Sequence, residues 1–241
     1  MSIWTPLLWL VIITPILIIA HFKSERTNFK YLLIFVIYFL FDNYLNSLDF
    51  IDTFLPNLNW NWDGKFLSLI LSLGFILFQS KEIRKDIGFT TKFNSKIKFG
   101  ILIFLGFLIF DFAFKYLVFP KGGEFNLESF LFQATMPGLT EEILFRGIYL
   151  WLLNKAFVSS KVINGVSFSW SFVIVTVLFG VAHGIILTES FEINYDIATI
   201  MYLTLISSLA LGLLRKYSGN LLLPILGHNI INVMNFLIRL M

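Results

Sequence analysis

The chain has 241 residues, of which 57% are hydrophobic and only 14% are charged. Soluble globular domains carry about 25% charged residues, so this composition excludes an ordinary soluble protein. The absence of cysteine excludes disulfides and thiolate metal sites. The net charge of +3 is modest and gives no indication of nucleic-acid binding.

The apolar residues gather in runs of about 20, the length at which an α-helix crosses a bilayer core of about 30 Å. The first run is interpreted as a span and not as a cleaved signal, because its basic residues follow the apolar stretch. The sequence therefore predicts an all-α, polytopic transmembrane helical bundle that forms one integral membrane domain over residues 1–241. In chain order we expect about eight spans, at residues 3–21, 31–44, 66–79, 99–119, 130–155, 168–187, 197–214 and 221–240.

The charges of the connecting loops alternate along the chain. Thirteen of the 18 lysines and arginines fall in the first, third, fifth and seventh connections. By the positive-inside rule these odd connections are cytoplasmic, so both termini are predicted to lie outside. The basic residues of the odd connections are Lys23, Arg26, Lys30, Lys81, Arg84, Lys85, Lys92, Lys96, Lys98, Lys155, Lys161, Arg215 and Lys216.

Three ionisable residues lie within six positions of the fifth span, Glu141, Glu142 and Arg146. Each charge at mid-bilayer costs about 2.5–3.5 kcal/mol on insertion scales. Glu142 and Arg146 are one helical turn apart and can form an ion pair. Glu141 is rotated by about 100° from Glu142, so we expect a free carboxylate that could act as a general base. The alternative is a buried charge network that only holds helices together.

Two histidines lie in other spans, His183 in the sixth and His228 in the eighth. Asn232 is one turn from His228 and shares its face, with Asn235 close to the next turn. A carboxylate and a histidine can polarise water, while a histidine and an amide can stabilise an oxyanion. Glu141, His183 and His228 are also a zinc ligand set with an open position for water, so the sequence leaves metal-free and metal-dependent hydrolysis open. We favour the metal-free reading and no cofactor.

The remaining polar residues of the spans are weaker signals. Asp111 is expected to pair with Lys115 or Arg146, and Asp42 is expected to be interfacial. The basic segment at residues 81–98 is expected to lie along the cytoplasmic membrane surface.

Together these residues resemble the motifs of the CPBP family, the CAAX proteases and bacteriocin-processing enzymes, also called the Abi family. The Glu-Glu-x-x-x-Arg motif matches Glu141 to Arg146, the Phe-x-x-x-His motif matches Phe179 and His183, and the His-x-x-x-Asn motif matches His228 and Asn232. The resemblance covers about residues 130–235. It implies a type II CAAX-endopeptidase fold with its catalytic core at 126–241, preceded by further spans at 1–125.

The resemblance also implies roles for these residues. Glu141 with His183 would activate water, His228 with Asn232 would stabilise the oxyanion, and Glu142, Arg146 and Phe179 would support them. The expected function is an intramembrane endopeptidase of a prokaryotic plasma membrane that cleaves a membrane-embedded or lipidated protein. The alternatives are a bacteriocin self-immunity or maturation factor, and a non-enzymatic scaffold or proton-coupled transporter. In the predicted topology Glu141 and His183 fall in the outer half of the membrane, whereas His228 falls nearer the inner half or the midplane.

Overall fold

The computed structural model describes residues 4–48 and 58–241. The first residue of the first predicted span, Ile3, and the acidic loop residues Asp49 and Asp52 lie outside the described residues.

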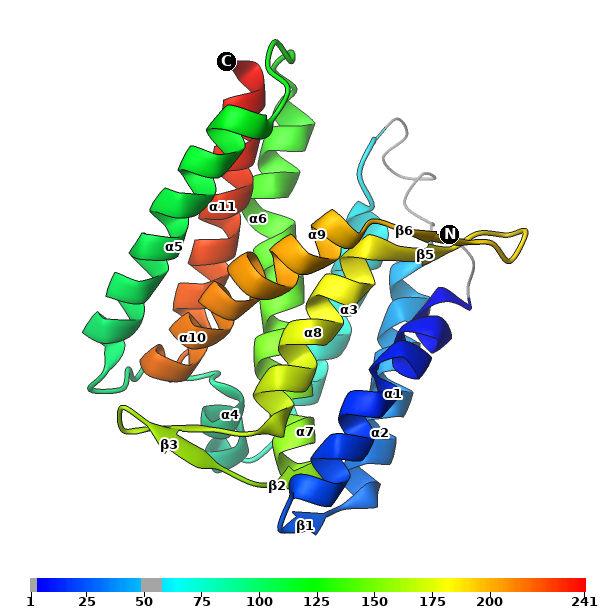
Figure 1. Cartoon of the computed structure of the whole chain (residues 1–241), viewed down its shortest axis with the longest axis vertical. Helices are drawn as coiled ribbons and strands as arrows, with labels where there is room; N and C mark the ends of the chain where they lie inside the picture. The colour runs from blue at the N-terminus through cyan, green and yellow to red at the C-terminus, as the bar shows by residue number, and fades with distance from the viewer. Residues whose placement is uncertain (1–3, 49–57) are drawn as a thin grey trace.

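Within the described residues the chain forms eight helical rods at the positions predicted for the spans (Figure 1). Two of the rods are built from three helical segments each, and a short extra helix lies between the third and fourth rods. The N-terminal half contains α1 (Thr5–Lys23), α2 (Phe29–Asn46), α3 (Trp62–Leu77), α4 (Lys81–Ile87) and α5 (Ile97–Val118). The C-terminal half contains α6 (Leu127–Glu142), η2 (Ile143–Tyr149), α7 (Leu150–Ala156), α8 (Trp170–Gly184), α9 (Ile197–Tyr202), η3 (Leu203–Ser208), α10 (Leu209–Ser218) and α11 (Leu222–Leu240).

The predicted all-α transmembrane class is confirmed. Among the described residues, four rods are long and apolar enough to cross a membrane by length and composition, and α8 is a shorter apolar helix. The number of rods that cross the bilayer stays a prediction. The four long rods are Thr5–Lys23, Ile97–Val118, Ile197–Ser218 and Leu222–Leu240.

The connections contain three short antiparallel ribbons, which the sequence did not predict. They are β1 (Arg26–Thr27) with β2 (Phe157–Val158), β3 (Lys161–Ile163) with β4 (Val166–Phe168), and β5 (Ile185–Leu187) with β6 (Ile193–Tyr195). The first ribbon ties the first connection to the fifth, and the backbone N–H of Asn94 donates to the carbonyl of Ser218 at 2.8 Å, which ties the third connection to the seventh. All four odd connections therefore meet at one end of the bundle, which we call the basic end (Figure 1).

The described parts of the second and fourth connections lie with the C-terminus at the opposite end. The Glu128 carboxylate at the start of α6 accepts the backbone N–H of Asn59 at 2.9 Å, and the N–H of Gly123 donates to the carbonyl of Arg239 at 2.8 Å. This geometry agrees with the alternation of charge along the sequence. Which end faces the cytoplasm stays a prediction.

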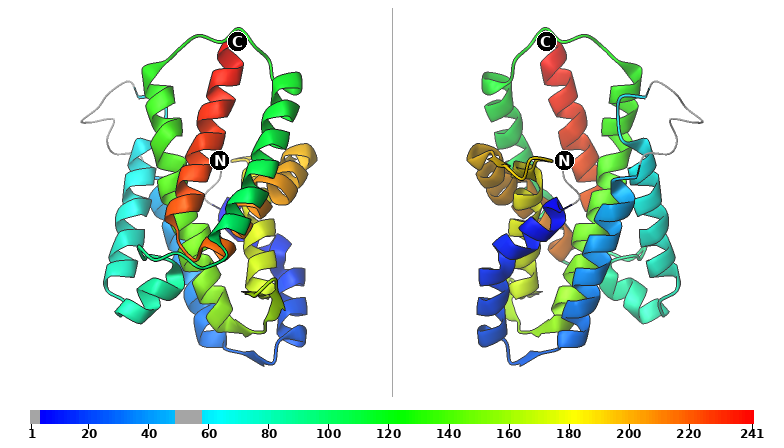
Figure 2. Two further views of the ribbon diagram at one scale, coloured as in Figure 1. Left: turned by 90° about the vertical axis from the view of Figure 1, so that its left-hand side faces the viewer. Right: turned by 90° about the vertical axis from the view of Figure 1, so that its right-hand side faces the viewer.

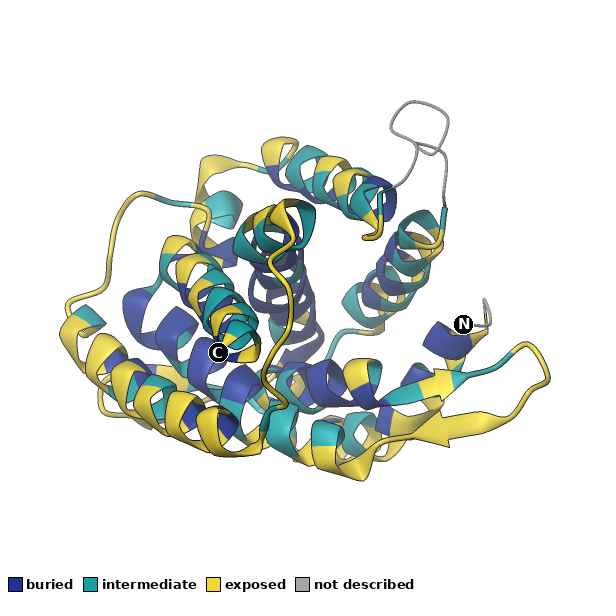
Figure 3. Ribbon diagram, turned by 90° about the horizontal axis from the view of Figure 1, so that it is seen from above, coloured by how far each residue is buried: buried dark blue, intermediate teal, exposed yellow. Residues whose placement is uncertain are grey.

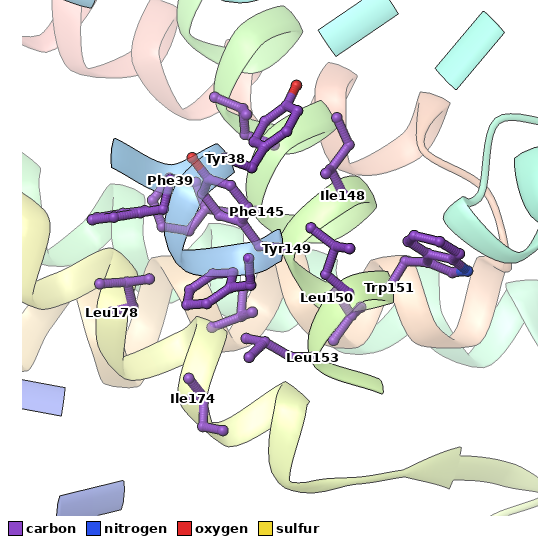
Figure 4. Packing of buried hydrophobic residues seen from close by; sticks show 14 of the residues in the cluster. Tyr38, Phe39, Phe145, Ile148, Tyr149, Leu150, Trp151, Leu153, Ile174 and Leu178 are labelled. Carbon is purple, nitrogen blue, oxygen red and sulfur yellow. The ribbon is translucent and has the colours of Figure 1, made fainter. Parts of the chain in front are cut away.

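The rod formed by α6, η2 and α7 runs through the middle of the bundle (Figures 1 and 2). Its lower half is enclosed by α1, α2 and α8, and residues such as Ile148, Leu152 and Leu153 are fully buried (Figure 4). Large apolar side chains are instead exposed on the outer faces of peripheral helices such as α5 (Figure 3). Apolar residues face outward in this way when the surrounding solvent is lipid.

Close approach of α8 to α9 and η3 requires glycine at position 180. A Cβ atom there would collide with the Thr204 hydroxyl and lie 2.7 Å from the carbonyl oxygen of Ile200. We expect Gly180→Ala to lower the free energy of unfolding by about 1–3 kcal/mol, the usual cost of overpacking. Thermal unfolding in detergent measures it. Gly106→Ala is the control, because a Cβ at Gly106 meets nothing within 4 Å, and equal stability of the two variants would contradict the expectation.

Candidate active site

The central rod changes its helical geometry beside the two glutamates. Pro137 lies inside α6 and offers no N–H to the helix. The next N–H, of Gly138, donates to the side-chain oxygen of Asn229 on α11 at 2.9 Å. From Ile143 to Tyr149 the rod is π-helical, a geometry found mostly as short segments at functional sites. Glu141 and Glu142 are therefore held between an opened α-helix and a π-helical turn.

Glu141 is not the free carboxylate that the sequence predicted. The Lys65 ammonium on α3 lies 2.8 Å from its Oε1 atom, and both side chains are largely buried. The other oxygen, Oε2, is buried and has no hydrogen-bond partner among the described residues. The expectation failed because a carboxylate in this setting needs a counter-ion, and the helix packing supplies one from the third rod. One oxygen of Glu141 is thus anchored and the other is available.

His183 lies at the end of α8 with its Nε2 atom 3.5 Å from Oε2 of Glu141. Its Nδ1 atom is 2.7 Å from the backbone carbonyl of Phe179. A carbonyl only accepts, so Nδ1 carries a proton, and Nε2 is the ring atom that faces the glutamate. Phe179 also stacks on His183, with 4.3 Å between the ring centroids.

His228 approaches the same oxygen from α11, with Nε2 3.9 Å from Oε2 of Glu141. Its Nδ1 atom lies 2.8 Å from Oε1 of Glu142. Glu142 is fully buried, and its Oε2 atom is 3.3 Å from Nε of Arg146. The predicted pair between Glu142 and Arg146 is therefore present, and this pair also orients His228.

Arg146 connects the two π-helical segments of the described chain. Its guanidinium donates to the hydroxyl of Ser208 in η3 at 3.0 Å and lies 4.3 Å from the centroid of the Phe179 ring. Its own backbone carbonyl accepts from Nε of Arg215 at 3.1 Å. The third motif residue of the fifth span is thus a buried link between η2, η3 and α8.

Asn232 lines a cavity of about 390 Å³ together with Glu141, His183 and His228. The structure therefore brings all four residues predicted to be catalytic to one cavity. Its apolar wall consists of Trp60, Phe132, Pro137, Phe179, Leu203, Leu211 and Ile231, and its further polar lining consists of Asn61, Lys65, Lys115, Gln133, Ser207 and Asn235.

The separation in depth expected between His228 and the other site residues is not observed. Both histidines lie within 4 Å of the same glutamate oxygen. The reason is that α8 is short and ends midway through the bundle, whereas α11 begins at the basic end and reaches the same level after two turns (Figure 1).

Two other aspartates are buried parts of the structure. Asp111 forms an ion pair with Lys115 at 2.8 Å, one of its two predicted partners. Asp111 also accepts a hydrogen bond from the Tyr202 hydroxyl. Asp42 is buried and accepts the hydroxyl of Ser68 at 2.7 Å, and its expected position at the membrane interface stays a prediction.

A metal ion fits this arrangement poorly. No three His, Asp or Glu side chains of the described residues are grouped as ligands for a metal ion. The positive charge of the Lys65 ammonium also lies beside Glu141, the carboxylate that would have to bind the metal. We therefore assign no step of the reaction to a metal.

One family model matches the part of the chain that contains this site. Residues 123–234 match the family model described as type II CAAX prenyl endopeptidase Rce1-like. This part of the chain is an Rce1-like domain. The domain contains Glu141, His183, His228 and Asn232, and the family as a whole consists of CAAX-type intramembrane proteases. Neither a curated protein nor a solved structure matches the chain at a significant level.

Proposed function

We propose that this Rce1-like protein is an intramembrane endopeptidase that hydrolyses a peptide bond with water activated by Glu141 and His183. The observation that carries the proposal is the meeting of Oε2 of Glu141 with Nε2 of His183 and Nε2 of His228, at 3.5 and 3.9 Å. A water molecule placed between Oε2 of Glu141 and Nε2 of a His183 ring that is protonated only at Nδ1 can donate a hydrogen bond to each. Its oxygen lone pairs are then free to attack a carbonyl carbon.

The reaction needs one base and one set of donors. Glu141 takes a proton from the attacking water through Oε2 while Lys65 holds Oε1. The carbonyl oxygen of the substrate gains negative charge, and the side-chain amide of Asn232, which lines the cavity, donates to it. His228 adds a second donor when its ring carries two protons, the form in which Nδ1 also donates to Glu142. The proton on Glu141 then passes to the leaving amine as the C–N bond breaks.

The cavity suits a substrate with an apolar segment. Seven of its lining residues are aromatic or aliphatic, among them Trp60, Phe132 and Ile231. Such a wall can bury the hydrocarbon of a membrane-embedded or lipidated peptide, gaining about 25 cal/mol for each Å² of apolar surface. A C-terminally prenylated peptide, the kind of substrate that the family description names, is therefore the first to test.

The test uses the purified protein in lipid nanodiscs. A prenylated C-terminal peptide and the same peptide without the prenyl group are incubated with it, and mass spectrometry follows the two cleavage fragments. We expect time-dependent cleavage of the prenylated peptide. Recovery of both peptides uncut would contradict the proposal for substrates of this chemistry, and a membrane-embedded peptide without lipid would then be tested in the same way.

Metal removal should leave this activity unchanged. Because Lys65 already neutralises Glu141, we expect the rate after prolonged treatment with a strong chelator to stay within twofold of the untreated rate. The control is a known zinc protease inactivated in the same buffer. A loss of activity that added zinc restores would instead assign Glu141, His183 and His228 as metal ligands.

A further inference from the structure

A second cavity, of about 460 Å³, lies at the basic end of the bundle and shares no lining residue with the active-site cavity. It is bounded by α4, the segment after α4, α7, the β3–β4 hairpin and the end of α10. Four cations line it, Lys85, Lys92, Arg215 and Lys216. We call it the basic cavity.

The cations of the basic cavity lack carboxylate partners. None of the four forms an ion pair with any described residue, and the one acidic side chain in the lining, Asp86, is paired with Lys155 at 3.6 Å. Arg215 is buried and donates only to backbone carbonyls, those of Arg146 at 3.1 Å and Asp86 at 3.0 Å. A buried guanidinium without a directly paired carboxylate is costly, so the cavity is suited to an anion.

A neutral donor in the wall also lacks an acceptor. The ring nitrogen of Trp151 is buried and has no hydrogen-bond partner among the described residues. Figure 4 shows this nitrogen at the edge of the apolar cluster, turned away from its other members. Buried N–H groups are nearly always paired in native structures. A ligand with several acceptor oxygens would satisfy both this indole and the surrounding cations.

The position of the cavity identifies the source of the anion. Trp151 follows Glu141 by ten residues in the same rod, which is at most about 15 Å at the α-helical rise of 1.5 Å per residue. Half of a hydrocarbon core of about 30 Å is the same length. If the glutamates lie near mid-bilayer, the basic cavity therefore lies at the level of the lipid headgroups.

From these observations we propose that the basic cavity binds the phosphate of an anionic lipid headgroup at the membrane surface. The lipid would fix the depth of the central rod, because α7 lines the cavity and the same rod holds Glu141. Arg215 joins the two sites, since it lines the cavity and donates to the carbonyl of Arg146.

Native mass spectrometry of the purified protein tests the proposal, with phosphatidylglycerol and phosphatidylcholine added in detergent. We expect preferential binding of phosphatidylglycerol. Each cation near an anionic lipid surface contributes about 1 kcal/mol, so Lys92→Gln combined with Lys216→Gln should weaken binding by about tenfold or more. Lys23→Gln combined with Lys30→Gln is the matched control, because it removes the same charge from the same end of the bundle but outside the cavity. The control should bind within twofold of wild type.

Three results would overturn the proposal. They are equal weakening in the two double variants, no preference for phosphatidylglycerol, and displacement of the lipid by millimolar inorganic phosphate, which would identify a site for a soluble anion. The Glu141→Gln protein is measured in parallel. Unchanged lipid binding by that protein is expected, so this test stands whether or not the chain is a protease.

Discussion

Glu141→Gln should reduce peptide hydrolysis by a factor of about 10²–10⁴, the usual contribution of a general base. Glutamine keeps the size of the side chain and can still accept a hydrogen bond from Lys65, but it takes up no proton from water. The reduction should appear in kcat, because the base acts in the transition state. Initial rates in nanodiscs with the peptide that the wild-type protein cleaves provide the measurement.

The matched control for this substitution is Glu124→Gln. Glu124 is exposed in the connection before α6 and lies outside the active-site cavity. The activity of the Glu124→Gln protein should therefore equal that of wild type. A Glu141→Gln protein that is folded and retains more than about one tenth of the wild-type rate would exclude Glu141 as the base. His183, the other acceptor facing the same point, would then be the candidate.

Lys65→Met should destabilise the protein by about 3 kcal/mol, because removing one partner leaves the buried Glu141 charge uncompensated. The Lys65 ammonium lies 2.8 Å from Glu141 and is its closest charged partner among the described residues. Chemical unfolding in mixed micelles measures the loss.

The double variant separates this ion pair from simple loss of packing. Adding Glu141→Gln to Lys65→Met removes the uncompensated charge, so most of the lost stability should return. Lys23→Met, at an exposed position on the basic end, should change stability by less than about 0.5 kcal/mol. If the double variant is no more stable than Lys65→Met alone, the interaction between Lys65 and Glu141 is not what holds α3 against the central rod.

The sequence predicted the rods and the site residues for clear physical reasons. Runs of apolar residues fix helix positions to within a few residues, and the loop charges alternate because the odd connections share one end of the bundle. Glu142 and Arg146 could be paired from their spacing alone, since residues four apart meet on a helix. Charged and polar groups inside spans are costly, and this pointed to Glu141, His183 and His228.

The contacts between rods could not be predicted in the same way. Lys65 falls just before the third predicted span, at 66–79, and only the packing of α3 against α6 brings it to Glu141 across 76 residues. The hydrogen bond of His228 to Glu142 spans 86 residues. The π-helical segments η2 and η3 have no simple sequence signal either. A buried carboxylate needs a positively charged partner. This rule predicts that Glu141 has such a partner, but it does not predict which residue the partner is.

The central claim is that this membrane protein cuts peptides by means of Glu141. Its most direct test compares host membranes that contain equal amounts of wild-type protein or the Glu141→Gln protein, with all peptide termini mapped by mass spectrometry. We predict new termini that appear only with the wild-type protein, clustered near the membrane-embedded or lipidated ends of their parent chains. Identical sets of termini from the two membranes would contradict the claim and favour a scaffold, transport or immunity role for the same buried charges.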